Sequence, residues 1–346
     1  TDNDNEAFYS ESEFFTDRSN LELKIQKIIG ALENDTNEYI DNVSLMIDSP
    51  KMLSVGISLS KKFDGSKLNQ ANIQFLVQEA KQQILKYYEN YNIAHIIINN
   101  YKIDSIDYSY LPDEIKCDFI SLDIFFICLP TELVLSLKNI FSKSNILINQ
   151  IICASYAKSI NYKNNLYLSG HMSFIDIGFN KTSIISYSND KFLSLSILPV
   201  GSNHITKDIS KILEIDLKKS EELKRNFVQN LKLSNDKDTS IDTLQKIIFA
   251  RTEEILELSA KSIESNLYSV DKFKMILTGE GSKILDNQGK DKISFSSDID
   301  FLEETLEDIC KSGFKFISKL NKQEVVVVPK KQIKQGFFEK FFYFFR

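Results

Sequence analysis

The sequence has no tryptophan, only four cysteines and only 11 glycines among its 346 residues. The cysteines are far apart, form no Cys-x-x-Cys pair and follow no secretory signal, so we expect reduced thiols in a cytosolic protein. No apolar run approaches the roughly 18 residues of a membrane-spanning helix, which excludes an integral membrane protein. Average usage would give about 24 glycines at this length, so each glycine in a turn is informative.

The residues that are present indicate a globular protein. Hydrophobic residues make up 42% of the chain and charged residues 26%, which is enough for a core and, at this length, for two domains. The net charge of −6 argues against a nucleic-acid partner. The charge is uneven, because residues 1–20 are acidic whereas residues 330–346 carry five basic residues against Glu339 alone. A basic end on an acidic protein is typical of a segment that binds an anionic surface.

Hydrophobic periodicity predicts the elements of the first half. Apolar residues at helical spacing predict helices over 21–32, 68–88 and 132–141, and β-rich runs predict strands at 43–47, 55–59, 94–98, 102–108 and 119–127. Residues 43–130 therefore form a mixture of strands and helix that we interpret as a subdomain inserted into a larger fold.

The second half has a different pattern. A strand at 146–152 runs into a short helix at 154–159, and three closely spaced strands at 172–177, 183–187 and 192–198 predict an antiparallel meander. Helices are then expected over 202–213, 220–230, 243–267 and 301–319, with strands at 274–277 and 325–328.

The first motif that carries chemistry is a strand ending in Asp176, a tight turn with Gly178, and a return strand that begins at Thr182. Such a hairpin tip can direct backbone N–H groups and the Thr182 hydroxyl at phosphate oxygens. Asp176 would hold Mg²⁺ through water, because Mg²⁺ keeps much of its hydration shell. Taken alone, these residues are explained better by an ordinary hairpin with an acid at its edge.

Two further motifs are weak by themselves. Thr278, Gly279, Gly281 and Ser282 follow a buried strand, and glycine there lets the backbone approach a ligand, although a simple strand–helix turn has the same sequence. Glu221 and Lys224 lie one helical turn apart, where they either bind a ribose or adenine or form a solvated ion pair.

The order of these motifs is what resembles a known family. The Asp-x-Gly hairpin is followed by Pro-Val-Gly-x-x-x-Ile-Thr-x-Asp-Ile at 199–209, then Glu-x-x-Lys, then Thr-Gly-x-Gly, with Ile-Ile-Phe-Ala-Arg-Thr-Glu-Glu-Ile-Leu at 247–256. Over about residues 20–285 this layout resembles FtsA, the family of actin-like bacterial cell-division proteins. The insertion at 43–130 distinguishes that family from Hsp70 and MreB.

The resemblance implies an α/β, actin-like (ribonuclease H-like) two-domain fold with an inserted subdomain and a C-terminal amphipathic helix. Its parts would be a remnant of the first subdomain at 1–42, which lacks the family's first strands and phosphate loop, and the insertion at 43–130. The rest of the first subdomain would be 131–170, the second subdomain 171–214 with 261–320, a small subdomain 215–260, a linker 321–330 and a membrane-binding helix 331–346.

The resemblance also implies ATP and Mg²⁺ as ligands, with little or no hydrolysis. The residues expected to bind nucleotide are Asp176, Gly178, Lys181, Thr182, Gly201, Ser202, Glu221, Lys224, Thr278, Gly279, Gly281 and Ser282, with Asp176 also holding Mg²⁺. The chain departs from the family at four positions of these loops. Phe179 and Asn180 replace usual glycines, Lys181 replaces a usual threonine, and Glu280 stands where glycine is common.

In the family the small subdomain receives the C-terminal peptide of FtsZ. The exposed face of the helix that contains Arg251 and Glu254 is therefore the expected FtsZ site, unless Arg251 only pairs with its acidic neighbours. The resemblance further implies self-association into protofilaments. The three histidines have no partners at metal-ligand or catalytic-triad spacing and are interpreted as structural.

The C-terminal residues predict membrane binding on physical grounds as well. At helical spacing Ile333, Phe337, Phe341 and Phe345 form one stripe, which Phe338 and Phe342 widen, while Lys334 and Lys340 lie away from it. Such a helix is too short to span a bilayer but suits its interface, whereas docking on the protein's own core is the alternative. FtsA proteins end in a membrane-targeting amphipathic helix, so family and physics agree.

The predicted function is a cell-division adaptor that tethers FtsZ filaments to the inner face of the cytoplasmic membrane at the division site and self-associates in an ATP-linked manner. Two alternatives stay open. One is an active ATPase of the actin/Hsp70 superfamily, and the other is an actin-like assembly protein associated with a pilus or microcompartment.

Overall fold

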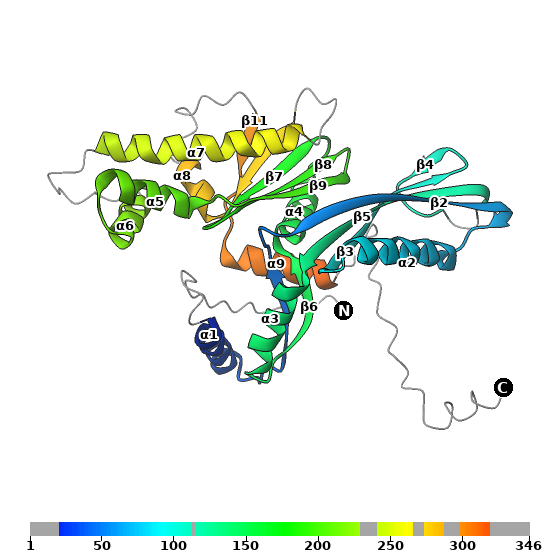
Figure 1. Ribbon diagram of the computed structural model, residues 1–346, viewed down its shortest axis with the longest axis horizontal. Helices are drawn as coiled ribbons and strands as arrows, with labels where there is room; N and C mark the ends of the chain where they lie inside the picture. Colours follow the sequence, from blue (N-terminus) through cyan, green and yellow to red (C-terminus); the bar gives the residue numbers. More distant parts are fainter. Residues whose placement is uncertain (1–20, 113–114, 229–240, 266–272, 287–297, 319–346) are drawn as a thin grey trace.

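The computed structural model describes residues 21–112, 115–228, 241–265, 273–286 and 298–318. The described chain forms three arms around a central sheet (Figure 1). Helices α5, α6 and α7 make one arm, the inserted strands and α2 make the second, and α1 with β1, β6 and α3 make the third. Among the described residues no helix is long and apolar enough to cross a bilayer.

The central sheet has five strands in the order β11-β10-β7-β8-β9. Its strands are β7 (Met172–Ile177), β8 (Thr182–Ser188), β9 (Lys191–Leu198), β10 (Lys274–Thr278) and β11 (Asp298–Phe301). The predicted antiparallel meander is confirmed in β7, β8 and β9, and β10 pairs parallel to β7 with Thr278 opposite Asp176. This register brings the hairpin and the Thr-Gly-x-Gly turn to the same edge.

Alternating side chains of the central sheet bury its two faces under different helices. Ile175, Ile177 and Ile184 pack against α7 (Ile241–Glu264). Phe174, Ile185 and Tyr187 lie on the other face, in a cluster with Tyr156 of α4 (Ala154–Asn165). The central sheet is thus packed between helices on both faces, with α4 on the face toward the first domain.

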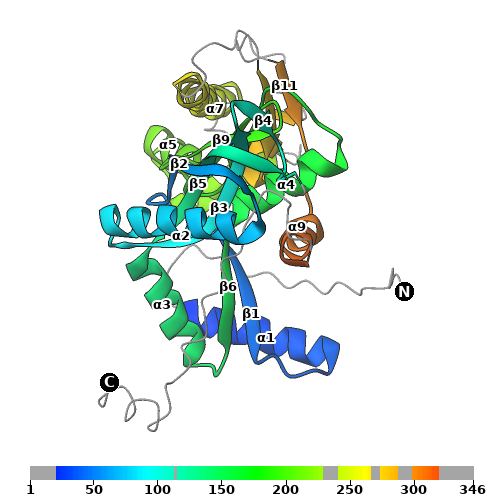
Figure 2. The same cartoon turned by 90° about the vertical axis from the view of Figure 1, so that its right-hand side faces the viewer.

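The inserted subdomain is an antiparallel sheet in the order β2-β5-β3-β4. Its elements are β2 (Leu53–Lys67), α2 (Gln70–Tyr87), β3 (Tyr91–Ile103), β4 (Ile106–Tyr108) and β5 (Lys116–Pro130). The stripe of α2 with Leu76, Val77 and Ala80 covers one face of this sheet (Figure 2). The subdomain also contacts the central sheet, because the Ser54 hydroxyl donates to the Leu195 carbonyl at 3.3 Å.

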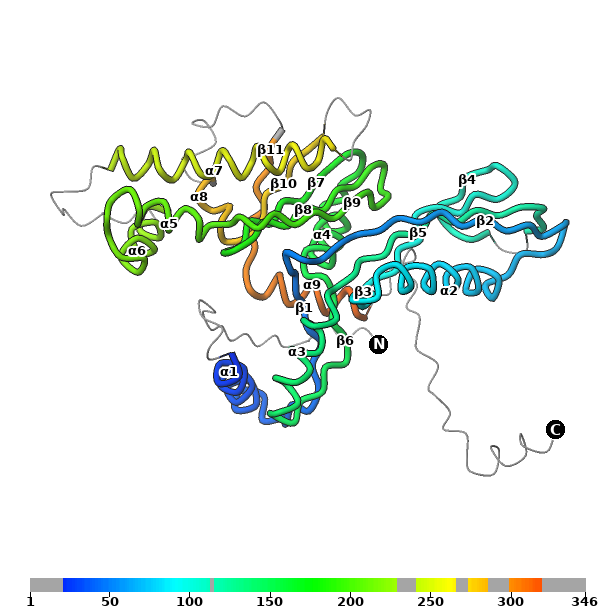
Figure 3. Tube along the Cα trace, in the orientation of Figure 1, coloured from blue at the N-terminus to red at the C-terminus, as the bar shows by residue number. Residues whose placement is uncertain are grey.

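The third arm is a two-stranded parallel sheet of β1 (Asn42–Ile47) and β6 (Leu147–Cys153), covered by α1 (Leu21–Thr36) and α3 (Thr131–Ser142). Figure 3 shows the chain leaving β1 for the inserted subdomain and returning through α3 to β6. Because β1 pairs with β6 and not with the inserted sheet, the insertion begins closer to β2 than the expected boundary at residue 43.

The end of the described chain differs most from the sequence prediction. The helix expected at about 301–319 is confirmed as α9 (Leu306–Ser318), which begins later than expected, and residues 298–301 form the strand β11, which the sequence did not predict. This helix packs against α4 and β1, not within the second subdomain. Gly313 allows the contact, since an added Cβ would lie 2.3 Å from Met46 Sδ.

The helical arm consists of α5 (Ser202–Leu213), α6 (Leu217–Val228) and the first half of α7. Ile205, Ile209 and Leu244 are among the residues of its own small core, which also includes Ile284 of α8 (Lys283–Asp286). The expected small subdomain 215–260 therefore shares α7 with the central sheet. The predicted linker 321–330 and membrane helix 331–346 lie outside the described residues.

Candidate functional site

The hairpin between β7 and β8 is the centre of the candidate site. Its turn is closed by the Gly178 N–H, which donates to the Lys181 carbonyl at 2.9 Å. The start of α5 packs directly on this turn, and a Cβ on Gly201 would lie 2.5 Å from the Gly178 oxygen. Real Cβ atoms do not approach so closely, so glycine at 201 is required by contact between two backbone segments.

The Thr-Gly-x-Gly turn packs on the other side of the same hairpin. Gly279 has φ +87°, and a Cβ there would lie 2.3 Å from Asp176 Oδ1. A Cβ on Gly281 would lie 2.5 Å from Cγ2 of Ile177. The structure thus brings Asp176, Gly178, Gly201, Gly279 and Gly281 together at one edge of the central sheet, as the family layout predicts. Their role in binding a nucleotide stays a prediction.

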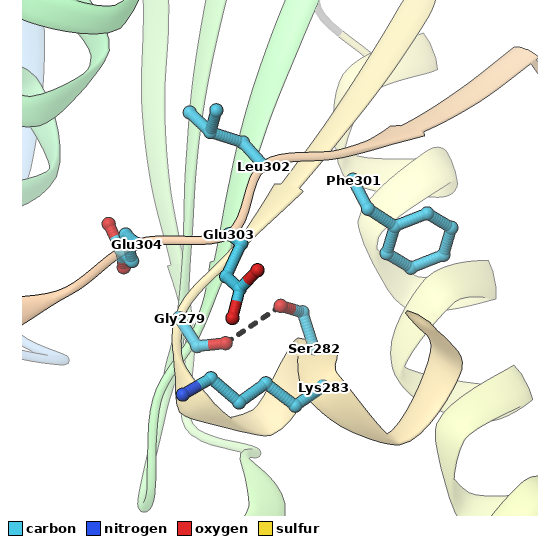
Figure 4. A pocket seen from close by; sticks show the side chains of 7 residues that line it. All are labelled: Gly279, Ser282, Lys283, Phe301, Leu302, Glu303 and Glu304. Carbon is cyan, nitrogen blue, oxygen red and sulfur yellow. Dashed lines mark hydrogen bonds between the residues drawn. The ribbon is translucent and has the colours of Figure 1, made fainter. Parts of the chain in front are cut away.

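The predicted hydroxyl donors are directed at the protein itself. The Thr182 hydroxyl is buried and donates to the Val200 carbonyl at 2.8 Å. The Ser282 hydroxyl donates to the Gly279 carbonyl at 2.7 Å (Figure 4), and Thr278 is buried in β10. The Thr182 and Ser282 hydroxyls therefore stabilise the loops themselves.

The N-terminus of α5 is also bound internally. Its Ser202 N–H donates to the Gly178 carbonyl at 2.9 Å, and its Asn203 N–H donates to the Phe179 carbonyl at 2.7 Å. The first amides of a helix are the groups that an anion would use. In this arrangement hairpin carbonyls take that position.

Lys224 is buried and Glu221 is half-buried, with 21% of its side chain exposed, so they do not form the fully solvated surface pair weighed from the sequence. The Lys224 ammonium donates to Glu221 Oε2 at 2.7 Å, to the Thr206 hydroxyl at 2.9 Å and to the Ser202 carbonyl at 3.2 Å. Burial lowers the pKa of Lys224, and the hydrogen bond to Glu221 opposes that effect. The pair therefore joins α6 to α5.

Phe179 lies between the hairpin and this pair. Its ring centre is 5.6 Å from the Lys224 ammonium, within the range of a cation–π contact. The replacement of a usual glycine by Phe179 therefore adds a contact from the hairpin to α6, in the space between the predicted phosphate loop and the predicted ribose-binding pair.

A buried ion cluster that the sequence analysis missed connects the two domains. Lys158 of α4 donates to Asp176 Oδ2 at 2.8 Å and to Glu304 Oε1 at 2.6 Å, and the Tyr162 hydroxyl donates to Glu304 Oε2 at 2.6 Å. Burial alone lowers the pKa of Lys158, but Asp176 and Glu304 raise it above its ordinary value. Burial, with the bond to Glu304, raises the pKa of Tyr162. At neutral pH the cluster thus holds a charged ammonium and a neutral phenol.

A second link between the domains runs from Lys181 to Asp48, just after β1. The Lys181 ammonium contacts the Asp48 carbonyl, and the Ser183 hydroxyl donates to Asp48 Oδ2 at 3.0 Å. The Asp48 carboxylate also accepts from the Ser155 N–H at 3.2 Å, which caps α4. Burial lowers the pKa of Lys181. The lysine expected to compensate at the phosphates therefore serves the domain contact.

A shallow pocket lies beside the Lys158 cluster and includes its Glu304. The pocket is lined by Gly279, Ser282, Lys283, Phe301, Leu302, Glu303 and Glu304 (Figure 4). Its empty volume of about 250 Å³ includes space open to solvent. Neither Asp176 nor the pair Glu221 and Lys224 lines it.

The Mg²⁺ that the family implies does not fit the described arrangement. One oxygen of Asp176 binds the Lys158 ammonium, and the other faces the Gly279 backbone. Within the ranges that the structure describes, no group of three His, Cys, Asp or Glu side chains is placed to hold a metal ion. Glu221, which is expected at the ATP site, is bonded to Thr206, Lys224 and Arg225, so its role in binding ATP stays a prediction. What the geometry provides is a set of ion pairs that join the two domains.

Arg251 of the predicted FtsZ site is mainly a structural link. It donates to both carboxylate oxygens of Asp208 on α5, at 2.6 and 3.0 Å, and to Glu254 at 2.5 Å. The interpretation that Arg251 only pairs with its acidic neighbours foresaw Glu254 but not Asp208. Glu254 remains half exposed, at 49% of its side chain. The predicted membrane-binding residues lie outside the described residues.

The signal for Lys158 was present in the sequence. Lys158 shares a helix face with Ala154 and Tyr162, so a charge stood on the apolar side of a helix. A lysine there must be paired when buried. Nothing comparable distinguished Glu304 from its neighbour Glu303, because its partner is remote in sequence.

Comparisons with known proteins agree with the family layout. The family model described as cell division protein FtsA matches residues 173–330. Cell division protein FtsA of Buchnera aphidicola is 23% identical over 311 residues, 82% of this chain and 72% of that protein. FtsA of Borreliella burgdorferi is 20% identical over 62% of this chain and 56% of that protein, and FtsA of Bacillus subtilis is 32% identical over 109 residues.

Among solved structures, the PilM–PilN type IV pilus biogenesis complex is similar with a TM-score of 0.58 and 13% identity, covering 86% of this chain and 81% of that chain. At this identity the similarity shows the fold alone, which is actin-like. This chain spans less than two thirds of the Borreliella protein, so activity and partners do not follow from similarity.

Proposed function

Because the chain is a divergent relative of the cell-division protein FtsA, we propose that it is a cell-division adaptor, which binds FtsZ and attaches it to the inner face of the cytoplasmic membrane. The observation that carries the proposal is the similarity to FtsA, which extends over 82% of this chain in the Buchnera protein. The family match begins within β7 and includes the hairpin, α5 and α7.

The adaptor acts by binding and not by turnover of nucleotide. Residues expected to bind nucleotide are bonded within the protein: Asp176 to Lys158, Lys181 to Asp48 and Glu221 to Lys224. ATP-linked self-association therefore requires these contacts to open. An active ATPase is the competing function. Release of phosphate from ATP that depends on Mg²⁺ and is lost in Asp176→Asn would favour it.

The FtsZ peptide is proposed to bind the exposed side of α7 that includes Glu254, which is called the exposed stripe of α7 below. Arg251 is unsuitable as a probe, since reversing its charge would also break the contact of α7 with Asp208. Glu254 is a better probe because its carboxylate is half exposed. The FtsZ peptide is commonly both apolar and charged, so a charge reversal on this stripe should change its affinity.

The experiment is co-sedimentation of the full chain with FtsZ filaments of the same organism. Glu254→Lys is expected to weaken co-sedimentation several-fold. Glu79→Lys, the same charge change at an exposed site on α2, is the matched control and should bind like the wild type. Equal binding by both variants removes this stripe from the site, and a wild-type chain that leaves FtsZ in the supernatant contradicts the adaptor function.

The membrane contact is proposed for residues 331–346. Each buried Phe contributes about 1.5–3 kcal/mol at most, and each basic residue near an anionic surface about 1 kcal/mol. Ordering a short helix offsets part of this sum. Because the apolar contribution dominates, Phe341→Glu with Phe345→Glu should release the chain from anionic liposomes, whereas salt should only weaken binding. Flotation of the double variant like the wild type would show that this segment is not the anchor.

A role as a pilus-associated assembly protein is the second candidate. The single observation in its favour is the structural similarity to the PilM–PilN complex, which shows the fold and nothing about partners. Failure to bind FtsZ, together with recovery of inner-membrane pilus proteins from cells, would support it.

A further inference from the structure

Lys158 brings one positive charge to the place where the sequence predicts Mg²⁺. Its ammonium lies between Asp176, near the end of β7, and Glu304, between β11 and α9, at 2.8 and 2.6 Å. The three side chains are 7%, 20% and 5% exposed. They come from parts of the chain as far apart as 146 residues, so the contact is a tertiary one.

The two carboxylates bind donors of the protein itself at oxygens that a metal would otherwise use. Glu304 receives Lys158 on one oxygen and the Tyr162 hydroxyl, from the next turn of α4, on the other at 2.6 Å. Asp176 receives Lys158 on one oxygen, while Gly279 packs against the other. A hydrated Mg²⁺ needs several water molecules around it, and one of the two Asp176 oxygens is already bound to the ammonium.

The charges also oppose a divalent ion. The Glu304 carboxylate is buried, the Asp176 carboxylate is 20% exposed, and a second cation placed beside the ammonium that they share would be repelled by it at short range. The ammonium is held by both carboxylates and stays charged at neutral pH, because the pKa of Lys158 lies above its ordinary value. A metal would therefore have to displace a buried, hydrogen-bonded side chain.

We propose that the Lys158 ammonium is the resident cation between Asp176 and Glu304, where it joins the two domains in place of a divalent metal. The link is then independent of Mg²⁺. The proposal does not rest on the function proposed above, since its test needs neither FtsZ nor a membrane.

Thermal unfolding of the full chain in EDTA and in millimolar MgCl₂ tests the proposal. The melting temperature of the wild type should be the same in both. Lys158→Ala should melt several degrees lower in EDTA and recover part of that loss in MgCl₂, because its two carboxylates then attract a divalent ion. Lys163→Ala is the matched control on the same helix, where Asp190 stays 55% exposed, so we expect little loss and no response to Mg²⁺.

Two results would overturn the proposal. In the first, Mg²⁺ raises the melting temperature of the wild type as much as that of Lys158→Ala. In the second, Lys158→Ala folds but its melting temperature does not change on adding Mg²⁺. If Lys158→Ala does not fold, the proposal is tested by comparing how Mg²⁺ changes the melting temperatures of the wild type and of Asp176→Asn. A rise in the wild-type melting temperature on adding Mg²⁺ that Asp176→Asn lacks contradicts the proposal, and its absence supports it.

Discussion

Two buried lysines of this molecule have similar exposure and opposite pKa shifts. Lys158 is 6% exposed and Lys224 is 5% exposed. The pKa of Lys158 is raised because two carboxylates outweigh the effect of burial, whereas burial lowers the pKa of Lys224, whose single carboxylate also binds Arg225. The number of carboxylates that one ammonium receives decides the sign.

The two lysines also join different things. Lys224 connects α6 to α5, which follow one another in the chain, whereas Lys158 connects a helix of the first domain to two elements around the central sheet. Loss of the first would loosen one arm. Loss of the second would remove a link between domains and leave two buried charges uncompensated. The Lys158 cluster should therefore dominate the electrostatic part of stability.

The largest effect is expected from Lys158→Ala. Removing one partner of a buried ion pair typically costs about 3–5 kcal/mol, because it leaves an uncompensated charge. Chemical denaturation at pH 7 measures the free energy of unfolding directly. For the intact group, a folded-state pKa above the unfolded value means that its contribution is complete at pH 7 and is lost only as the pH rises through the raised value. A loss below about 1 kcal/mol would place the cluster in a solvated environment.

The next largest effect is expected from replacing glycines with positive φ by alanine. A comparison of two such glycines separates the cost of a close contact from the cost of the backbone conformation. Gly279 (φ +87°) packs against Asp176, whereas Gly170 (φ +91°) has nothing within 4 Å of an added Cβ. Gly170→Ala should therefore cost only the roughly 1–2 kcal/mol of a left-handed alanine. Gly279→Ala should cost clearly more, because Gly279 has ψ 158°, in a region that is essentially restricted to glycine, and because the hairpin must also move. Equal losses in thermal unfolding would mean that the turn at Gly279 does not press on Asp176.

A smaller effect concerns Glu221 and acid. Burial opposes ionisation of Glu221, but hydrogen bonds from Lys224 and Thr206 lower its pKa below the ordinary value. Its contribution is thus present above about pH 4.3, the unfolded value, and is lost as the pH falls through the folded value. Glu221→Gln should lower stability by about 1 kcal/mol at pH 7 and by less at pH 3. A loss that grows on acidification would contradict this assignment.

Local patterns predicted the elements well because their signals are local. The meander of β7 to β9 follows from short connections between apolar runs, and the glycines at 201, 279 and 281 follow from turns that need close backbone contact. The misplaced boundary at residue 43 and the strand β11 depend on pairing with remote strands, which periodicity does not contain. The roles of Lys158 and Glu304 likewise depend on a tertiary contact, and family resemblance directed attention to Asp176 alone.

A double-mutant cycle between Lys158 and Glu304 tests most directly that the chain's own cation joins the two domains. Lys158→Met keeps the aliphatic stem, and Glu304→Gln keeps an acceptor for Tyr162. We expect the free energies of unfolding of the two single variants to be non-additive by at least about 1 kcal/mol, with the double variant more stable than their sum implies. Additivity within about 0.3–0.5 kcal/mol would contradict the account.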